Sequence, residues 1–172
     1  MQADLSPVIA ATARWLTCAY PSYGGALASA LCEVQARQAA TVAAWLRYPT
    51  PMDAALVGVA GPGGSARLDW ITGADGADAE DDAWRTWVDE VVASWAACLL
   101  GDPELAALAV AALAEGDHTA GTPLEFRRLV APDDGDRRAA ALLRHPDLLA
   151  PVARLHRSQL LDRLKPGRAL IA

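Results

Sequence analysis

The 172-residue chain has few of the residues that build β-sheets. It contains one phenylalanine, three tyrosines and three isoleucines, so the aromatic and β-branched residues that favour strands are scarce. Alanine, which has the highest helix propensity and is depleted in strands, occurs 39 times. We therefore predict an all-α protein that is at least about 60% helical and has no sheet of three or more strands.

Lysine and asparagine are also nearly absent. Lys165 is the one lysine beside 14 arginines, and there is no asparagine, whereas alanine, glycine and proline are frequent. GC-rich codons produce this composition, so we expect a bacterial source of high GC content. Because of the same bias, an arginine in place of a lysine carries little functional information here.

The three cysteines are odd in number and far apart, and each lies in an apolar helical stretch (Cys18, Cys32 and Cys98). This pattern favours buried thiols in a reducing compartment over disulfides or a metal site. The N-terminus has no basic region ahead of an apolar run, and the apolar stretches 91–100 and 105–114 are about half as long as a membrane-spanning helix. We expect a cytoplasmic protein without a membrane span.

The length suits a single compact domain, and Ser, Thr or Asp followed by Pro marks several helix starts. These pairs are Ser6-Pro7, Thr50-Pro51, Asp102-Pro103 and Thr122-Pro123. With the apolar periodicity they predict seven or eight helices, which cover approximately residues 6–20, 26–48, 50–60, 82–100, 102–114, 122–130, 137–144 and 147–164, the last with a kink or break near Pro151. Residues 1–164 then form one helical domain and residues 165–172 a C-terminal tail.

Two helical faces are expected to be buried. Along residues 26–48 the larger apolar side chains keep one face, namely Leu27, Leu31, Val34, Val42, Trp45 and Leu46. A helix capped by Asp81 or Asp82 carries the clearest apolar stripe, namely Trp84, Trp87, Val88, Val91, Trp95, Cys98 and Leu99. The segments around Trp15-Leu16 and Trp45-Leu46 also resemble each other, as the units of an internal repeat do. Stacked helical pairs are therefore an alternative to an irregular bundle.

The polar segments resemble helix caps more than sites of chemistry. The acidic stretch 75–82 does not have the ligand order of a calcium loop, and Asp133-Asp134-Gly135-Asp136 is typical of a turn followed by a cap. The three histidines show no metal-ligand spacing, and no nucleophile elbow, phosphate loop or dinucleotide fingerprint occurs. We therefore assign no catalytic residue, metal or cofactor, and we favour a protein without enzymatic activity over an enzyme.

Charge divides the chain into two parts of opposite sign. Residues 1–120 contain 15 acids and 5 bases, a net charge of −10, and residues 121–172 contain 6 acids and 10 bases, a net charge of +4. The bases near the C-terminus are the predicted partner-binding residues, namely Arg154, Arg157, Arg163, Lys165 and Arg168.

The hypothesis that follows is a non-catalytic protein-interaction module, such as an adaptor, assembly factor or chaperone of a larger bacterial complex. Its partner is another protein or a second copy of the chain. One alternative is a nucleic-acid-associated protein that uses the arginine-rich C-terminal helix. Another is a small helical enzyme with an apolar pocket lined by tryptophans.

Overall fold

The computed structural model describes residues 4–74, 79–116, 118 and 126–166, with the side chains of residues 79–81 excepted. Within these residues 73% are helical and no strand occurs, which confirms the all-α prediction. The helices, in chain order, are α1 (Ser6–Ala19), α2 (Ala26–Arg47), α3 (Pro51–Ala60), α4 (Ala66–Thr72), the 3₁₀-helix η1 (Ala79–Trp87), α5 (Glu90–Gly101), α6 (Pro103–Leu113), α7 (Arg127–Val130), α8 (Asp134–Ala139), α9 (Pro146–Ala153) and α10 (Arg157–Arg163).

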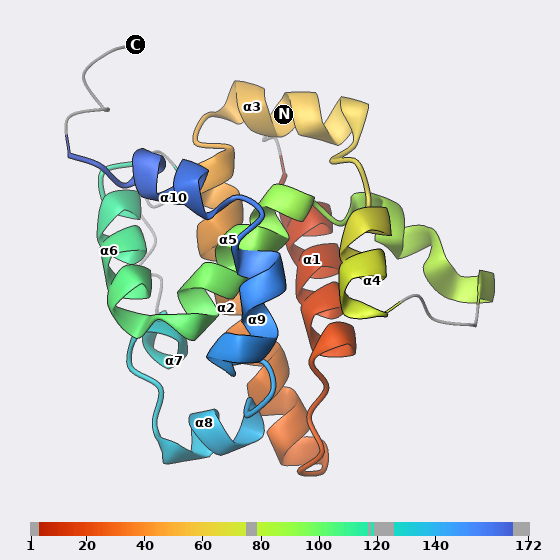
Figure 1. Ribbon diagram of the computed structural model, residues 1–172. Helices are drawn as coiled ribbons and strands as arrows, with labels where there is room; N and C mark the ends of the chain where they lie inside the picture. The colour runs from red at the N-terminus through yellow and green to blue at the C-terminus, as the bar shows by residue number, and fades with distance from the viewer. Residues whose placement is uncertain (1–3, 75–78, 117, 119–125, 167–172) are drawn as a thin grey trace.

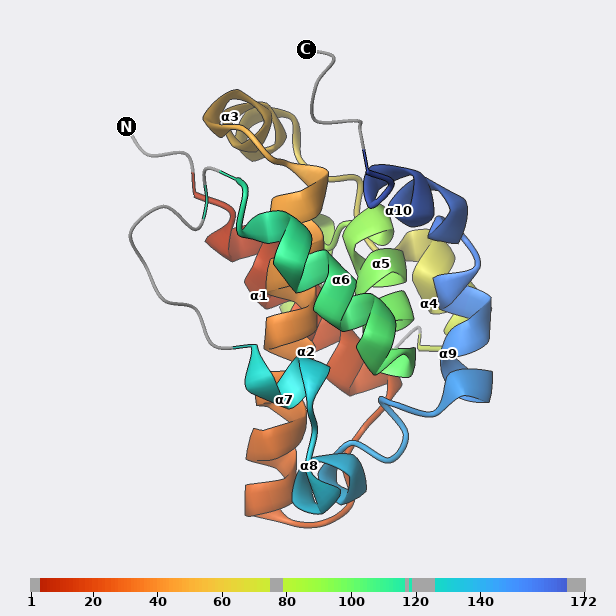
Figure 2. The same ribbon diagram turned by 90° about the vertical axis from the view of Figure 1, so that its left-hand side faces the viewer.

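Helix α5 lies at the centre of the bundle, between α2 and α9 (Figure 1). Helix α1 packs along α2, and α6 packs against both α2 and α5. Helix α3 lies across one end of the bundle and α8 lies at the opposite end, as the two views show (Figure 2). None of the described helices is long and apolar enough to cross a membrane.

Alanine allows the central helices to approach closely. On α2 and α5 the fully buried positions include many alanines, namely Ala36, Ala39, Ala40, Ala43, Ala93 and Ala96. Larger side chains fill the spaces around this contact, among them Trp15, Leu16, Leu99 and Leu143. Small side chains at the contact shorten the distance between helix axes, so a chain with one phenylalanine still forms a dense core.

Two of the predicted helix starts are confirmed as side-chain caps. Thr50 forms a capping box with Asp53, and Asp102 accepts a hydrogen bond from the Leu105 amide. Ser6 is instead the first residue of α1, where Asp4 accepts hydrogen bonds from its amide and hydroxyl. Thr122 lies outside the described residues. Farther along the chain, the expected cap is present as a capping box between Asp133 and Asp136, but residues 134–136 form the first turn of α8 and not a turn ahead of the helix.

The expected tryptophan helix is shorter than predicted. Helix α5 begins at Glu90, because Asp89 caps it by accepting hydrogen bonds from the amides of Val91 and Val92 at 2.9 and 3.1 Å. Trp84 and Trp87 belong to η1, whose geometry places them beside the core, not on the α5 stripe. Of that stripe, Trp95, Cys98 and Leu99 are buried, whereas Val91 is half-buried. Helix α4 was not predicted.

The predicted inner face of α2 is confirmed at Val42 and Leu46, which are buried, but not in the first half of the helix. Leu27 is 75% exposed and Val34 is 40% exposed, and the buried positions there are instead Cys32, Gln35 and Ala36. The first turns of α2 lie at the α8 end of the molecule (Figure 1), and Leu27 and Val34 are on the side of the helix that faces solvent. Cys18 is exposed, contrary to the expectation for all three thiols, whereas Cys32 and Cys98 are buried.

The predicted final helix is divided in two. Pro151 lies inside α9, and the break comes after it, at residues 154–156 between α9 and α10. Buried serine and tryptophan side chains hold this break against α5. The Ser94 hydroxyl accepts a hydrogen bond from the His156 amide at 3.0 Å, and the Trp95 indole donates to the His156 carbonyl at 3.0 Å.

A polar network fastens α7 and α8 to α2. The Arg144 guanidinium donates to Gln35 Oε1 at 2.5 Å and to the carbonyls of Leu100, Arg128 and Leu129 at 3.2, 2.6 and 3.4 Å. Gln35 is fully buried and donates in turn to the Asp136 carbonyl at 2.9 Å. Burial lowers the pKa of Arg144 to about 10, so it remains charged at neutral pH.

Candidate functional site

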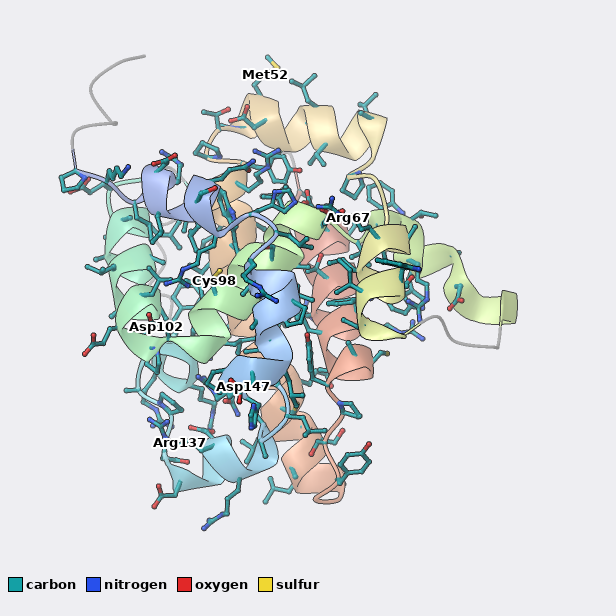
Figure 3. All side chains as sticks on the ribbon, in the orientation of Figure 1. Met52, Arg67, Cys98, Asp102, Arg137 and Asp147 are labelled. Atoms are coloured by element: carbon teal, nitrogen blue, oxygen red, sulfur yellow. The ribbon has the colours of Figure 1, made fainter. Side chains whose placement is uncertain are left out.

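Helix α3 presents an apolar surface that no described part of the chain covers. Ala54 and Val57 are its buried residues, and they hold it against the bundle end. On the outer side Met52 is 68% exposed, Leu56 is 60% exposed and Val59 is 90% exposed. We call these three side chains the α3 face. Met52 points away from the bundle at the edge of the molecule (Figure 3).

The α3 face owes its form to the local sequence. Pro51 and the Thr50–Asp53 capping box fix the start of the helix, and Gly61 ends it in a conformation with a φ of 77°. Positions 52, 56 and 59 follow a spacing of four and three, so their side chains lie on one side of a helix. Asp53 is the one charged residue of α3, which leaves the outer side almost wholly apolar.

A cleft of about 720 Å³ opens at the C-terminal end of α3. Residues 58–61 and 63–66 line it together with Asp69 of α4 and with Asp82, Arg85, Thr86 and Trp87 of η1. Gly63 and Gly64 have backbone φ values of 110° and 87°, which residues other than glycine rarely adopt. The Gly64 amide donates a hydrogen bond to the Val88 carbonyl at 3.0 Å. We call this space the end cleft. It shares Val59 with the α3 face.

Asp69 is the centre of the polar contacts in the end cleft. It accepts hydrogen bonds from the Trp15 indole at 2.8 Å, the Ser65 hydroxyl at 2.7 Å and the Arg85 guanidinium at 2.7 Å. Arg85 also contacts Asp82 at 3.1 Å. Burial acts to lower the pKa of Arg85, but Asp82 and Asp69 outweigh it, so the pKa is raised. The guanidinium is therefore a fixed positive charge between two carboxylates.

The predicted basic residues are divided between two grooves. Arg154 and Arg157 line a cavity of about 280 Å³ between α5 and α9, together with Cys98. Burial raises the pKa of the Cys98 thiol, although Arg157 opposes this, so the thiol is protonated at neutral pH. In the described part of the chain neither arginine forms an ion pair with a carboxylate.

Arg163 and Lys165 line the second groove, a cavity of about 390 Å³ between α6 and α10. Both already have contacts within the chain. Arg163 donates to the Leu46 carbonyl at 3.1 Å, and Lys165 forms an ion pair with Asp162 at 2.7 Å. Arg168 lies outside the described residues. The structure thus places Arg154 and Arg157 at one cavity and Arg163 and Lys165 at another.

Histidine and carboxylate side chains form structural contacts. His156 bonds to Glu90, which also pairs with Arg67, and His118 stacks on Trp45 with ring centroids 5.4 Å apart. Over the residues with described side chains, no group of three or more His, Cys, Asp or Glu is arranged to hold a metal ion.

Sequence reasoning did not identify the α3 face. Residues 51–60 were predicted as a helix, and the high apolar content of Met52 to Val59 could have indicated that a short helix cannot bury every side. The end cleft could not be found in this way, because it joins residues 58–66 to residues 82–87. No protein-family model, no curated protein and no solved structure matches the chain.

Proposed function

We propose that the protein is a non-catalytic protein-interaction module, an adaptor or assembly factor of a larger bacterial complex, and that its partner docks on the α3 face. The observation that carries this proposal is the exposure of Met52, Leu56 and Val59 on one side of a capped helix. Contiguous apolar surface of this kind is costly in water and marks interaction sites in folded proteins.

The energetics favour a protein partner. Full burial of a valine, leucine or methionine side chain contributes about 1.5–3 kcal/mol, so three together can offset a substantial part of the entropy lost on association. The capping box at Thr50 and the buried Ala54 and Val57 hold α3 in place before binding. A pre-ordered surface loses little further entropy when a partner covers it.

Site-specific photocrosslinking in the native host tests the proposal. A photoreactive amino acid replaces Leu56 in one variant and Leu27 in another, because Leu27 is a leucine on α2 that is even more exposed, at 75% against 60%. We expect one discrete protein adduct from position 56 and none of the same mass from position 27. The adduct partner is then identified by mass spectrometry and purified.

Binding of the purified partner is measured by calorimetry for wild type, Leu56→Gln and Leu27→Gln. We expect Leu56→Gln to weaken binding at least about tenfold, as the loss of a buried leucine from an interface does, and Leu27→Gln to leave it unchanged. Circular dichroism confirms that both variants fold. Equal adducts from both positions, or equal affinities of both variants, would contradict a docking role for α3.

A further inference from the structure

The α3 face and the end cleft form one continuous surface with two different characters. Val59 belongs to both, and Gly58 and Ala60 continue the cleft wall next to it. The face is apolar, whereas the cleft contains Asp69, Asp82 and Arg85. A segment bound along α3 therefore meets charged groups where the helix ends.

The electrostatics of the end cleft favour a positive charge. Asp69 and Asp82 outnumber Arg85, the single base of the described cleft walls. The C-terminal end of α3 lies at the same place, and the aligned peptide dipoles give such an end a partial negative charge.

The carboxylates of Asp69 and Asp82 differ in their exposure and in the number of contacts that they already make within the chain. The Asp69 side chain is 14% exposed and accepts three hydrogen bonds from within the chain. The Asp82 side chain is 35% exposed, and among the described residues its ion pair is with the Arg85 Nε. Asp82 is therefore the carboxylate that an incoming cation can reach. Trp87 also lines the cleft, and the face of an aromatic ring attracts cations.

The cleft also has room for a long side chain. Its volume of about 720 Å³ is in the range of small-ligand pockets, and the glycines at 58, 61, 63 and 64 leave one wall without bulky groups. Arginine and lysine have flexible apolar stems that pack on such a wall while the charged group reaches a carboxylate.

We propose that the α3 face and the end cleft together bind an amphipathic helix of a partner protein, with apolar side chains on Met52, Leu56 and Val59 and a basic side chain in the cleft beside Asp82. This inference rests on the proposed function, since it names the chemistry of the partner that docks on α3. An anionic membrane surface fits less well, because Asp53 and Asp82 lie at the two ends of the surface and repel it.

Three synthetic peptides test the inference. Each is an 18-residue helix former with leucines at spacings of three and four and an otherwise uncharged polar face, and they differ at one central residue, which is Arg, Gln or Glu. Binding to the full-length protein is measured by fluorescence anisotropy at low and moderate salt. We expect the Arg peptide to bind about fivefold more tightly than the Gln peptide at low salt and the Glu peptide to bind most weakly, as a partly shielded ion pair predicts.

The protein variants assign this preference to the cleft. Asp82→Asn should bring the Arg and Gln peptides to equal affinity, and Asp82→Glu should restore the preference. Asp134→Asn removes an exposed carboxylate on α8, at the opposite end of the bundle, and should change nothing. Leu56→Gln should weaken all three peptides by a similar factor.

The outcomes separate this inference from the proposed function. Equal binding of the Arg and Gln peptides to wild type, with all binding lost in Leu56→Gln, would refute the claim that the cleft binds a basic side chain. The α3 face would then remain a docking surface. Peptide binding that Leu56→Gln does not change would overturn both. A concentration-dependent dimer in sedimentation that Leu56→Gln abolishes would show that a second copy occupies the surface, and would also overturn the inference.

Discussion

Replacing Arg144 by methionine removes the guanidinium that joins α2, α5 and α7. In the wild type, this group donates to the Gln35 side chain and to the carbonyls of Leu100, Arg128 and Leu129. Methionine retains much of the apolar stem but offers no donor. Several acceptors therefore lose their partner together, and the fully buried Gln35 Oε1 is the one that water can least reach.

The loss of stability can be worked out from these contacts. A buried acceptor without a donor costs about 1–3 kcal/mol. Three or four acceptors are affected, but Arg144 itself is only part-buried, so water reaches some of them, and the variant no longer desolvates a charge. We expect a net loss of about 3 kcal/mol, a large part of the roughly 5–15 kcal/mol typical of a domain.

Urea unfolding followed by circular dichroism at 222 nm measures this loss. With a denaturant slope of about 2 kcal/mol per molar, the midpoint should fall by about 1.5 M. Arg138→Met, at an exposed arginine of α8, is the matched control and should leave the midpoint unchanged. A double-mutant cycle with Gln35→Leu should show coupling, because the two side chains share a hydrogen bond. A loss below about 1 kcal/mol in Arg144→Met would refute the assigned role of the network.

Three further predictions follow from single contacts. Trp95→Ala should lower the free energy of unfolding by about 3–5 kcal/mol, because the ring is buried and its indole donates to a backbone carbonyl; a loss under about 1 kcal/mol would contradict that burial. Burial and the hydrogen bond to Asp89 raise the pKa of Tyr48, so the contribution of this side chain to stability should be constant below pH 10 and then fall with rising pH by up to about 1.4 kcal/mol per unit. Urea midpoints between pH 8 and 11 should show a shallower fall in Tyr48→Phe, and an unchanged fall would exclude Tyr48 as its source. A partner that also contacts Arg154 and Arg157 should bind Arg154→Glu/Arg157→Glu more weakly than wild type at low salt in binding assays, whereas equal binding at low and moderate salt would show that these two arginines do not contact the partner.

The helical class and several helix boundaries could be predicted from the sequence, because they depend on local interactions. Alanine content determines helix propensity, and a cap such as Thr50 or Asp102 needs only residues two or three positions away. For the same reason, the cap near Asp133 was predictable, although the helix begins directly after it and includes the segment predicted as a turn. In the last helix, Pro151 indicated an interruption, although the break itself lies after Arg154, where α5 offers partners.

Burial could not be determined in this way, since it depends on which helix lies opposite. Leu27 and Val34 have the same local pattern as buried leucines, yet α1 and α8 cover another side of α2, and the two side chains stay exposed. Trp84 and Trp87 lie at helical spacing from Trp95, but Asp89 caps α5 after them and divides the stripe. In each case the local sequence allows two arrangements, and contacts with distant residues select one.

The candidate site depends still more on the tertiary structure. The apolar character of residues 52–59 is a property of the sequence, but their exposure follows from the position of α3 across the end of the bundle, where Ala54 and Val57 alone face inward. The end cleft exists because the turn after α3 and the 3₁₀-helix η1 meet across Asp69. Sequence periodicity reports on neighbours along one helix, whereas a docking surface and a cleft arise from groups that folding brings together.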